Sequence, residues 1–245
     1  MVETPAGSFL TAEWRFLAML NWEVDRPLLQ PFVPAGTELD DWNGTLHASL
    51  VGFLFQETRV LGIRFPFHTE FEEVNLRLYV RRKTADGWRR GVVFVKELVP
   101  RPIVAFLARR VYHENYVALP MGHAIDFRSD GSPARVSYSW TSAASSGRLG
   151  LAVAPASRFP EAGSAEEFLA EHYFGYVRQP DGGTLEYAVE HPRWRLSPAL
   201  EARLDADVRP LYGDGFAAAL DRPPDVAFLA EGSAIRVRRG RRIPP

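Results

Sequence analysis

The chain has 245 residues, 46% of them hydrophobic and 24% charged, which is enough to bury a sizeable core. Its formal net charge of -1 gives no global field that would attract nucleic acid, and the absence of cysteine excludes disulfides, thiolate catalysis and cysteine metal sites. No apolar run approaches the roughly 18 residues of a spanning helix, and residues 1–5 do not resemble a secretory signal, so we expect a cytoplasmic protein without a membrane partner.

Glycine and proline, 19 of each, separate many short segments, a pattern typical of numerous turns. In chain order, residues 14–22 are compatible with a strand or a helix, and the other apolar segments have mainly strand character. Strands are predicted at 45–58, 71–82, 88–99, 118–127, 134–141, 149–154, 184–190, 194–204 and 226–238. Helices are predicted at 27–32, 103–112 and 164–173. Many antiparallel strands with few helices predict a mainly β protein, an α+β barrel or sandwich, and the lack of linkers predicts one domain over residues 1–245.

The segment 71–82 alternates cleanly between apolar and polar residues. Its apolar face consists of Val74, Leu76, Leu78 and Val80. Its polar face consists of Glu73, Asn75, Arg77 and Tyr79. This polar face is compatible with solvent exposure, the common meaning of alternation, and also with the lining of a cavity for a small polar ligand.

The next segment, 88–99, has apolar residues on both faces, which predicts a strand covered on both sides. Strict alternation places Val93 and Val95 on one face with Glu97. It places Phe94 on the other face together with Lys96.

Three segments together carry a resemblance to a known family: FEEVNLRLYV at 71–80, GVVFVKELVPR at 91–101, and YHENY at 112–116 followed by LPM at 119–121. With Trp22 and the segment PAGTELD at 34–40, they resemble the bacterial family labelled "domain of unknown function 2071". That family is similar in fold to acetoacetate decarboxylase. The resemblance implies a curved β-barrel or cone with a central cavity and a few outer helices.

Acetoacetate decarboxylase forms an imine between a lysine and its β-keto acid, and the resemblance makes Lys96 the candidate for that lysine and Glu73 the candidate for a cavity carboxylate. Such a lysine must be neutral to attack, which requires a lowered pKa. The sequence departs from the decarboxylase here, because Glu97 follows Lys96 where a second lysine is expected. A neighbouring carboxylate raises a lysine pKa. Lys96 is therefore also compatible with an ion pair to Glu73, or with a fixed cation that binds a carboxylate.

Other site types have little support in the sequence. His113 and His123 do not form a zinc motif, and there is no serine nucleophile elbow and no dinucleotide or phosphate loop, so no metal and no cofactor is expected. The arginine-rich end at 236–242 is more typical of a solvated strand end than of a nucleic-acid site.

The sequence thus predicts an interior pocket that binds or acts on a small organic acid, with the oligomeric state open. Arg77 or Lys96 is expected to bind the ligand carboxylate, with Asn75 nearby. Glu73 and Tyr79 are expected to orient the ligand or exchange protons. The alternatives are a Schiff-base lyase that uses Lys96, of the decarboxylase or aldolase type, and a non-catalytic interaction protein.

Overall fold

The computed structural model describes residues 8–64, 69–111, 113–143 and 146–243. The described residues form one 14-stranded sheet with four short α-helices, which confirms the mainly β prediction. The strands of the barrel described below are β1 (Ser8–Glu23), β3 (His47–Val60), β4 (Phe71–Thr84), β5 (Gly87–Val99), β10 (Phe174–Arg178), β11 (Thr184–Glu190) and β13 (Val226–Arg238). The others are β2 (Glu38–Leu39), β6 (Tyr116–Ala118), β7 (Met121–Phe127), β8 (Pro133–Thr141), β9 (Ser146–Val153), β12 (Leu196–Ala206) and β14 (Arg241–Ile243).

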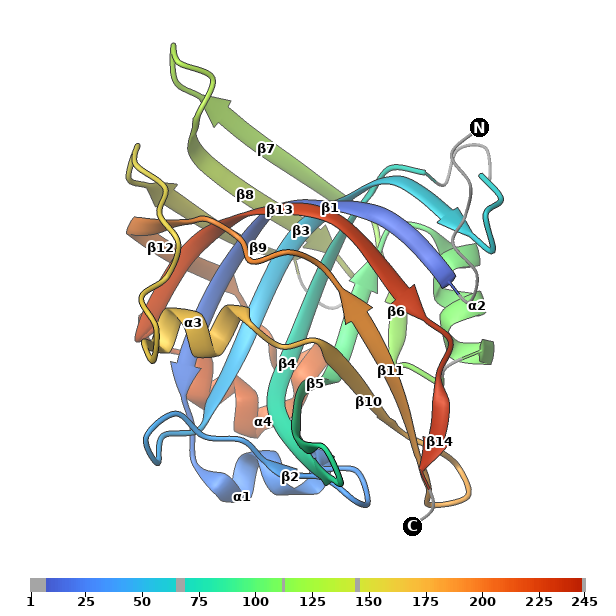
Figure 1. The fold of residues 1–245 in the computed structure, drawn as a ribbon. Helices are drawn as coiled ribbons and strands as arrows, with labels where there is room; N and C mark the ends of the chain where they lie inside the picture. Colours follow the sequence, from blue (N-terminus) through green and yellow to red (C-terminus); the bar gives the residue numbers. More distant parts are fainter. Residues whose placement is uncertain (1–7, 65–68, 112, 144–145, 244–245) are drawn as a thin grey trace.

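Seven of these strands close into a barrel, in the order β11-β10-β5-β4-β3-β1-β13, because β11 pairs with both β10 and β13. Neighbours are antiparallel except β10 and β5, so the barrel is mixed. Figure 1 shows the long strands curving around a common interior. Closure gives the barrel an inside and an outside, and each long strand contributes alternate residues to both.

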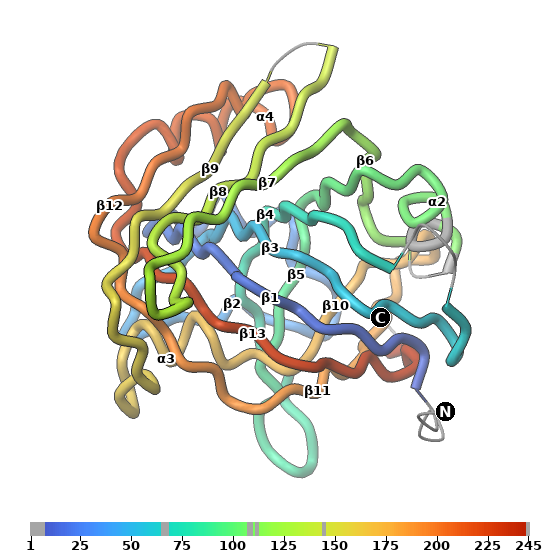
Figure 2. Tube along the Cα trace, turned by 90° about the horizontal axis from the view of Figure 1, so that it is seen from above, coloured from blue at the N-terminus to red at the C-terminus, as the bar shows by residue number. Residues whose placement is uncertain are grey.

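A second layer covers the outside of the barrel. Strands β12, β9, β8 and β7 continue the sheet from β13 and fold back over β1 and β3 (Figure 2). The layers approach closely at Gly52, where a Cβ atom would lie 2.5 Å from the ring of Tyr138. Tyr138 is fully buried there, and its hydroxyl donates to the carbonyl of Phe16 at 2.8 Å.

The helices lie outside the barrel. They are α1 (Arg26–Leu29), which continues into a 3-10 turn at Gln30–Phe32, α2 (Pro102–Val111), α3 (Ala165–Ala170) and α4 (Arg209–Leu220). Ser164 caps α3, since its hydroxyl accepts from the Glu167 amide at 3.1 Å. Helix α4 was not predicted, nor were β10 and β14; the ambiguous segment 14–22 belongs to β1. No helix among the described residues is both long enough and apolar enough to span a bilayer.

The pairing of β4 with β5 contains a bulge that matters for the site. Leu76 pairs with Lys96, but Arg77 pairs with Phe94, so Val95 is an extra residue on β5. A bulge of one residue reverses the facing of everything beyond it. Phe94 therefore shares the inner face with Glu97, and the prediction that Lys96 shares a face with Phe94 is wrong.

Candidate functional site

The barrel encloses a cavity of about 580 Å³. Its walls are mostly apolar, with aromatic side chains from β1, β3, β4 and β5: Trp14, Phe53, Phe55, Phe71 and Phe94. At one end the cavity is lined by Leu61, just after β3, and Ile103, on α2, which are 52% and 50% exposed. The cavity therefore reaches the surface between the end of β3 and α2.

Three carboxyl groups converge on the cavity and are called the acid pole here: Glu73 of β4, Glu97 of β5 and Glu114, which follows α2. All three side chains are buried. Glu73 accepts from the hydroxyl of Tyr116 at 3.0 Å, and Glu114 accepts from the hydroxyl of Tyr187 at 2.8 Å. Two tyrosine hydroxyls thus hold two of the three carboxyl groups in place.

Burial raises the pKa of each carboxyl in the acid pole, because removing the charged form from water is costly. Desolvation raises the pKa of Glu73 to about 7, against the lowering effect of hydrogen bonds from Asn75 and Tyr116. It raises the pKa of Glu114 to about 8. The pKa of Glu97 also lies well above its usual range, from burial and from the nearby Glu114 and Glu73. Much of the acid pole is therefore protonated near neutral pH.

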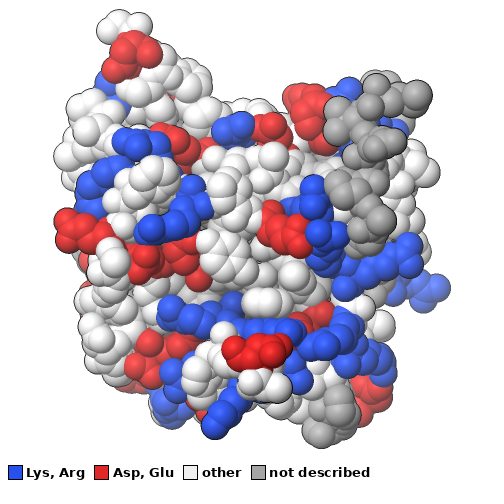
Figure 3. All heavy atoms as spheres, viewed as in Figure 1, with Lys and Arg blue, Asp and Glu red and all other residues white. Residues whose placement is uncertain are grey.

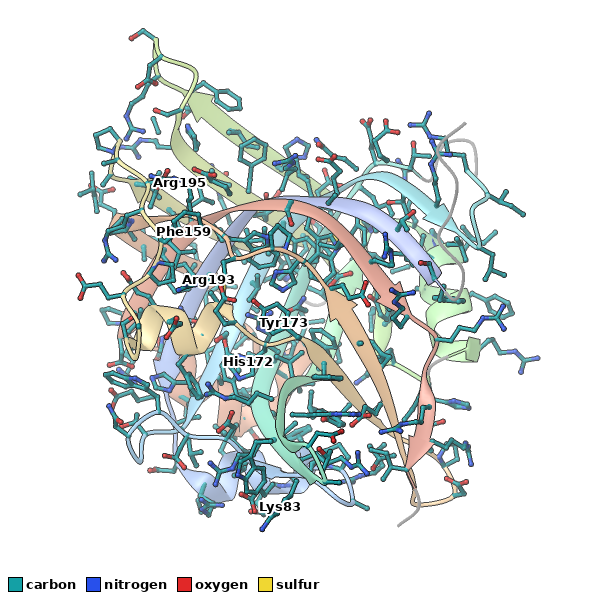
Figure 4. All side chains as sticks on the ribbon, in the orientation of Figure 1. Lys83, Phe159, His172, Tyr173, Arg193 and Arg195 are labelled. Carbon is teal, nitrogen blue, oxygen red and sulfur yellow. The ribbon has the colours of Figure 1, made fainter. Side chains whose placement is uncertain are left out.

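Two basic side chains also line the cavity, Arg77 and His172, and are called the basic pole here. Arg77 donates from Nη2 to the carbonyl of Leu169 at 3.1 Å, while its Nε has no hydrogen-bond partner among the described residues. His172 lies between α3 and β10 (Figure 4), 3.6 Å from a carboxylate oxygen of Asp40. Burial lowers the pKa of His172 to about 4, so its ring is neutral at pH 7 and Arg77 carries the charge.

The structure brings together three of the predicted polar residues, because the alternation of β4 is regular. Glu73, Asn75 and Arg77 all line the cavity. Tyr79 lies further along the same strand, where its hydroxyl contacts the Ser49 hydroxyl at 2.6 Å and the Leu169 carbonyl at 3.4 Å. Its ring packs 4.7 Å from that of His172, so Tyr79 supports the basic pole from behind.

Lys96 does not join this site. The bulge in β5 directs it outward, where its ammonium donates to the carbonyl of Leu211 on α4 and lies 5.8 Å from the ring of Tyr212. Burial lowers its pKa, but away from the cavity. The other lysine of the chain, Lys83, lies near the β4–β5 turn (Figure 4), so neither lysine lines the cavity. Lys96 and Glu73 face opposite sides of the barrel wall, and the expected pairing between them does not form.

Several cavity residues escaped the sequence analysis. Strict alternation placed Glu97 on the face opposite Phe94, because alternation does not anticipate the bulge. Glu114 appeared only within the segment 112–116 that carries the family resemblance. Glu114 and Tyr116 are two residues apart in an extended segment, a spacing that places both on one side. Nothing in the sequence distinguished His172 or Tyr187 from core aromatics.

The arginines near the C-terminus are engaged within the protein. Arg236 and Arg238 pair with Glu190 at 3.3 and 2.7 Å, and Arg241 pairs with Glu186 at 2.9 Å. On the face of the molecule that Figure 3 shows, positive and negative side chains are interspersed. Among the residues that the structure describes, no group of three or more His, Asp or Glu side chains has the geometry to hold a metal ion.

Comparison with known proteins agrees with this architecture. A family model, DUF2071, described as an uncharacterized conserved protein, matches residues 11–234. An uncharacterized protein of Bacillus subtilis, YqjF, is 28% identical over 135 residues, which span 52% of this chain and 54% of YqjF, about half its length.

Two solved structures share the fold over nearly the whole chain. The acetoacetate decarboxylase of Legionella pneumophila superposes with a TM-score of 0.70 at 10% identity, covering 99% of this chain and 93% of its own. The enduracididine biosynthesis enzyme MppR, complexed with pyruvate, gives a TM-score of 0.65 at 14% identity, covering 98% and 91%. The prediction of an acetoacetate decarboxylase-like barrel is confirmed.

Proposed function

The chain belongs to the DUF2071 family of uncharacterized conserved proteins, and from this premise we propose that its cavity binds a small organic acid and exchanges protons with it without forming an imine. The ligand carboxylate binds to Arg77, and the acid pole faces the rest of the ligand. The apolar walls contact a hydrocarbon or aromatic body.

The observation that carries this proposal is the state of Arg77. Its guanidinium lines the cavity and bonds to a main-chain carbonyl, although three carboxyl groups line the same cavity. Arg77 is half-buried, and withdrawing a cation from water without an anionic partner costs free energy. Guanidinium can bind a carboxylate through two parallel hydrogen bonds. A ligand carboxylate would supply the anionic partner that the Arg77 guanidinium lacks.

The acid pole suits the proposal in two ways. Because its carboxyl groups are largely protonated near neutral pH, they do not repel an incoming anion as strongly as three carboxylates would. A carboxyl group with a pKa of about 7, as at Glu73, is matched to proton transfer at neutral pH. Among the cavity residues, Glu73 is therefore the proposed general acid or base.

The likeness to MppR complexed with pyruvate supports an organic acid as ligand class, as a proposal by analogy of fold. The alternative of a Schiff-base lyase is supported by the likeness to acetoacetate decarboxylase, and the outward position of Lys96 weighs against it. A non-catalytic interaction protein is the remaining alternative, and it predicts a cavity that binds no acid.

The binding test is calorimetric titration with short and medium alkanoates, benzoate and pyruvate, each compared with its neutral amide. We expect at least one acid to bind and its amide to bind at least tenfold more weakly. Arg77→Met should lose this discrimination, whereas the exposed Arg203→Met should retain it. No acid binding across the panel, or equal binding by Arg77→Met, would refute the proposal.

The chemical test follows solvent deuterium exchange next to the carbonyl of bound keto acids by NMR. We expect exchange that Glu73→Gln slows at least tenfold and Lys96→Met leaves unchanged. Borohydride treatment with pyruvate should give no mass increase on Lys96. A stable adduct on Lys96 would instead establish the imine mechanism.

A further inference from the structure

Two hydrogen-bond acceptors at the acid pole lack partners. Oδ1 of Asn75 and Oε2 of Glu97 are buried atoms with no hydrogen-bond partner among the residues that the structure describes. Both residues are 2% exposed, and both line the cavity. They face each other directly across β4 and β5 in the strand register. A pair of opposed acceptors therefore borders the same part of the cavity.

The orientation of the Asn75 amide is fixed by its other end. Its Nδ2 donates to Oε1 of Glu73 at 3.0 Å, so its Oδ1 is turned away from that carboxylate. No described residue donates to the Asn75 acceptor, and a donor on a ligand would satisfy it. The hydroxyls of Tyr116 and Tyr187 already donate to Glu73 and Glu114.

The charged side chains around Asn75 and Glu97 indicate which kind of ligand group would donate to these acceptors. Glu73, Glu97 and Glu114 surround this part of the cavity, and Arg77, the cation of the cavity, lies two residues beyond Asn75 on the same face of β4. Two residues along a strand span about 7 Å. An ammonium group has three donors and no acceptor. Burial keeps the acid pole largely protonated near neutral pH, but a cation bound there would lower the pKa of these carboxyl groups and favour their charged form.

We propose that the acceptor pair of Asn75 and Glu97 binds an ammonium group, so that the ligand is a dipolar amino acid with its carboxylate on Arg77 and its amine at the acid pole. The carboxylate end of this assignment rests on the proposed function. Between the two ends, Phe94 lies opposite Arg77 in the register and provides an apolar contact for a methylene chain. The ligand class is thus an amino acid whose amine and carboxylate are separated by several carbons.

Calorimetry with four matched probes tests this assignment on the intact protein. The probes are terminal aminohexanoate, hexanoate, hexylamine and terminal hydroxyhexanoate, with aminobutanoate and aminooctanoate to vary the length. We expect one of the amino acids to bind at least tenfold more tightly than the unsubstituted acid of the same length. We also expect it to bind more tightly than hexylamine.

Substitutions test whether the affinity gained from the ligand amine depends on Asn75 and Glu97. Asn75→Leu removes one acceptor, and Glu97→Gln keeps the shape while removing the ionisable group. In each, the ratio of aminohexanoate to hexanoate affinity should fall towards one. The exposed Glu201→Gln should leave the ratio as in the wild type. Circular dichroism verifies that each variant is folded. If Asn75→Leu does not fold, Glu97→Gln provides the test.

The outcomes separate this inference from the proposed function. Hexanoate binding without a gain from the amine overturns the dipolar ligand and leaves the organic-acid proposal standing. Equal affinity for hydroxyhexanoate and aminohexanoate overturns the requirement for an ammonium. Binding of hexylamine alone overturns both the dipolar ligand and the organic-acid proposal. A ratio that neither variant changes overturns the role of the acceptor pair.

Discussion

The two faces of strand β4 are both buried, but they are built differently. On the outer face, Val74, Leu76, Leu78 and Val80 are each 0% exposed and belong to a continuous apolar core beneath the second layer and α4. On the inner face, their neighbours Glu73, Asn75 and Arg77 surround open volume. Asn75 Oδ1 and Arg77 Nε remain without hydrogen bonds among the described residues.

This contrast indicates what each face is for. Packed apolar side chains lower the free energy of the folded state, whereas buried polar groups without partners raise it. The outer face therefore stabilises the barrel, and the inner face costs stability that a bound ligand would restore. Substitutions on the two faces should consequently separate stability from binding.

The largest effect on stability is expected on the outer face. Leu76→Ala removes a fully buried side chain from the core and should lower the free energy of unfolding by about 2–5 kcal/mol. Urea denaturation measures this loss. Leu200→Ala, at a side chain that is 68% exposed, is the matched control and should change stability little. If both variants lose stability equally, the outer face is not the supporting core.

On the inner face, Glu97→Gln should raise stability, and only at high pH. The folded-state pKa of Glu97 lies well above its usual 4.5, so the folded protein holds a proton that the unfolded chain releases as pH rises. The stability that Glu97 contributes is therefore full below about pH 4.5 and falls as pH rises towards its raised folded-state pKa.

Glutamine does not ionise, so the variant does not lose stability in this way as pH rises. At pH 8.5 we expect the variant to be more stable than the wild type, with little difference below pH 5. Denaturant midpoints across pH measure the difference. The exposed Glu201→Gln should show no such divergence. A Glu97→Gln variant that is less stable at high pH would contradict a protonated acid pole.

A smaller effect is expected from Tyr116→Phe. The Tyr116 hydroxyl donates to Glu73 at 3.0 Å and lowers its pKa, so its removal should raise the pKa of Glu73 further above 7. Infrared titration of the carboxyl band measures this shift, with Tyr173→Phe as a control at a tyrosine bonded to Glu171 instead. Loss of this hydrogen bond should reduce stability by about 1 kcal/mol. An unchanged or lowered pKa at Glu73 would contradict the assigned contact.

The smallest effect is expected at Lys96, on the outer side of the wall. Lys96→Met removes the hydrogen bond to the carbonyl of Leu211 and should cost about 1 kcal/mol or less. Ligand affinity should not change, because the ammonium does not line the cavity. Parallel denaturation and calorimetry measure both quantities. A tenfold loss of affinity would place Lys96 in the site after all.

Local features of the sequence determined much of the framework. The Asn43–Gly44 pair, a sequence typical of tight turns, forms one with both residues at positive φ, and Ser164 caps α3. The regular alternation of β4 correctly placed Glu73, Asn75 and Arg77 on one face. The family resemblance then supplied the barrel, which no single segment encodes.

Only the tertiary structure decided the chemistry of the cavity. A single extra residue at Val95 turns Lys96 outward and brings Glu97 inward, and β5 is apolar on both faces, so its sequence carries no signal of that shift. Glu114, His172 and Tyr187 come from separate segments that meet only when the barrel closes. Periodicity within a strand follows from local backbone geometry, whereas a bulge and a cavity depend on the pairing of strands far apart in the chain.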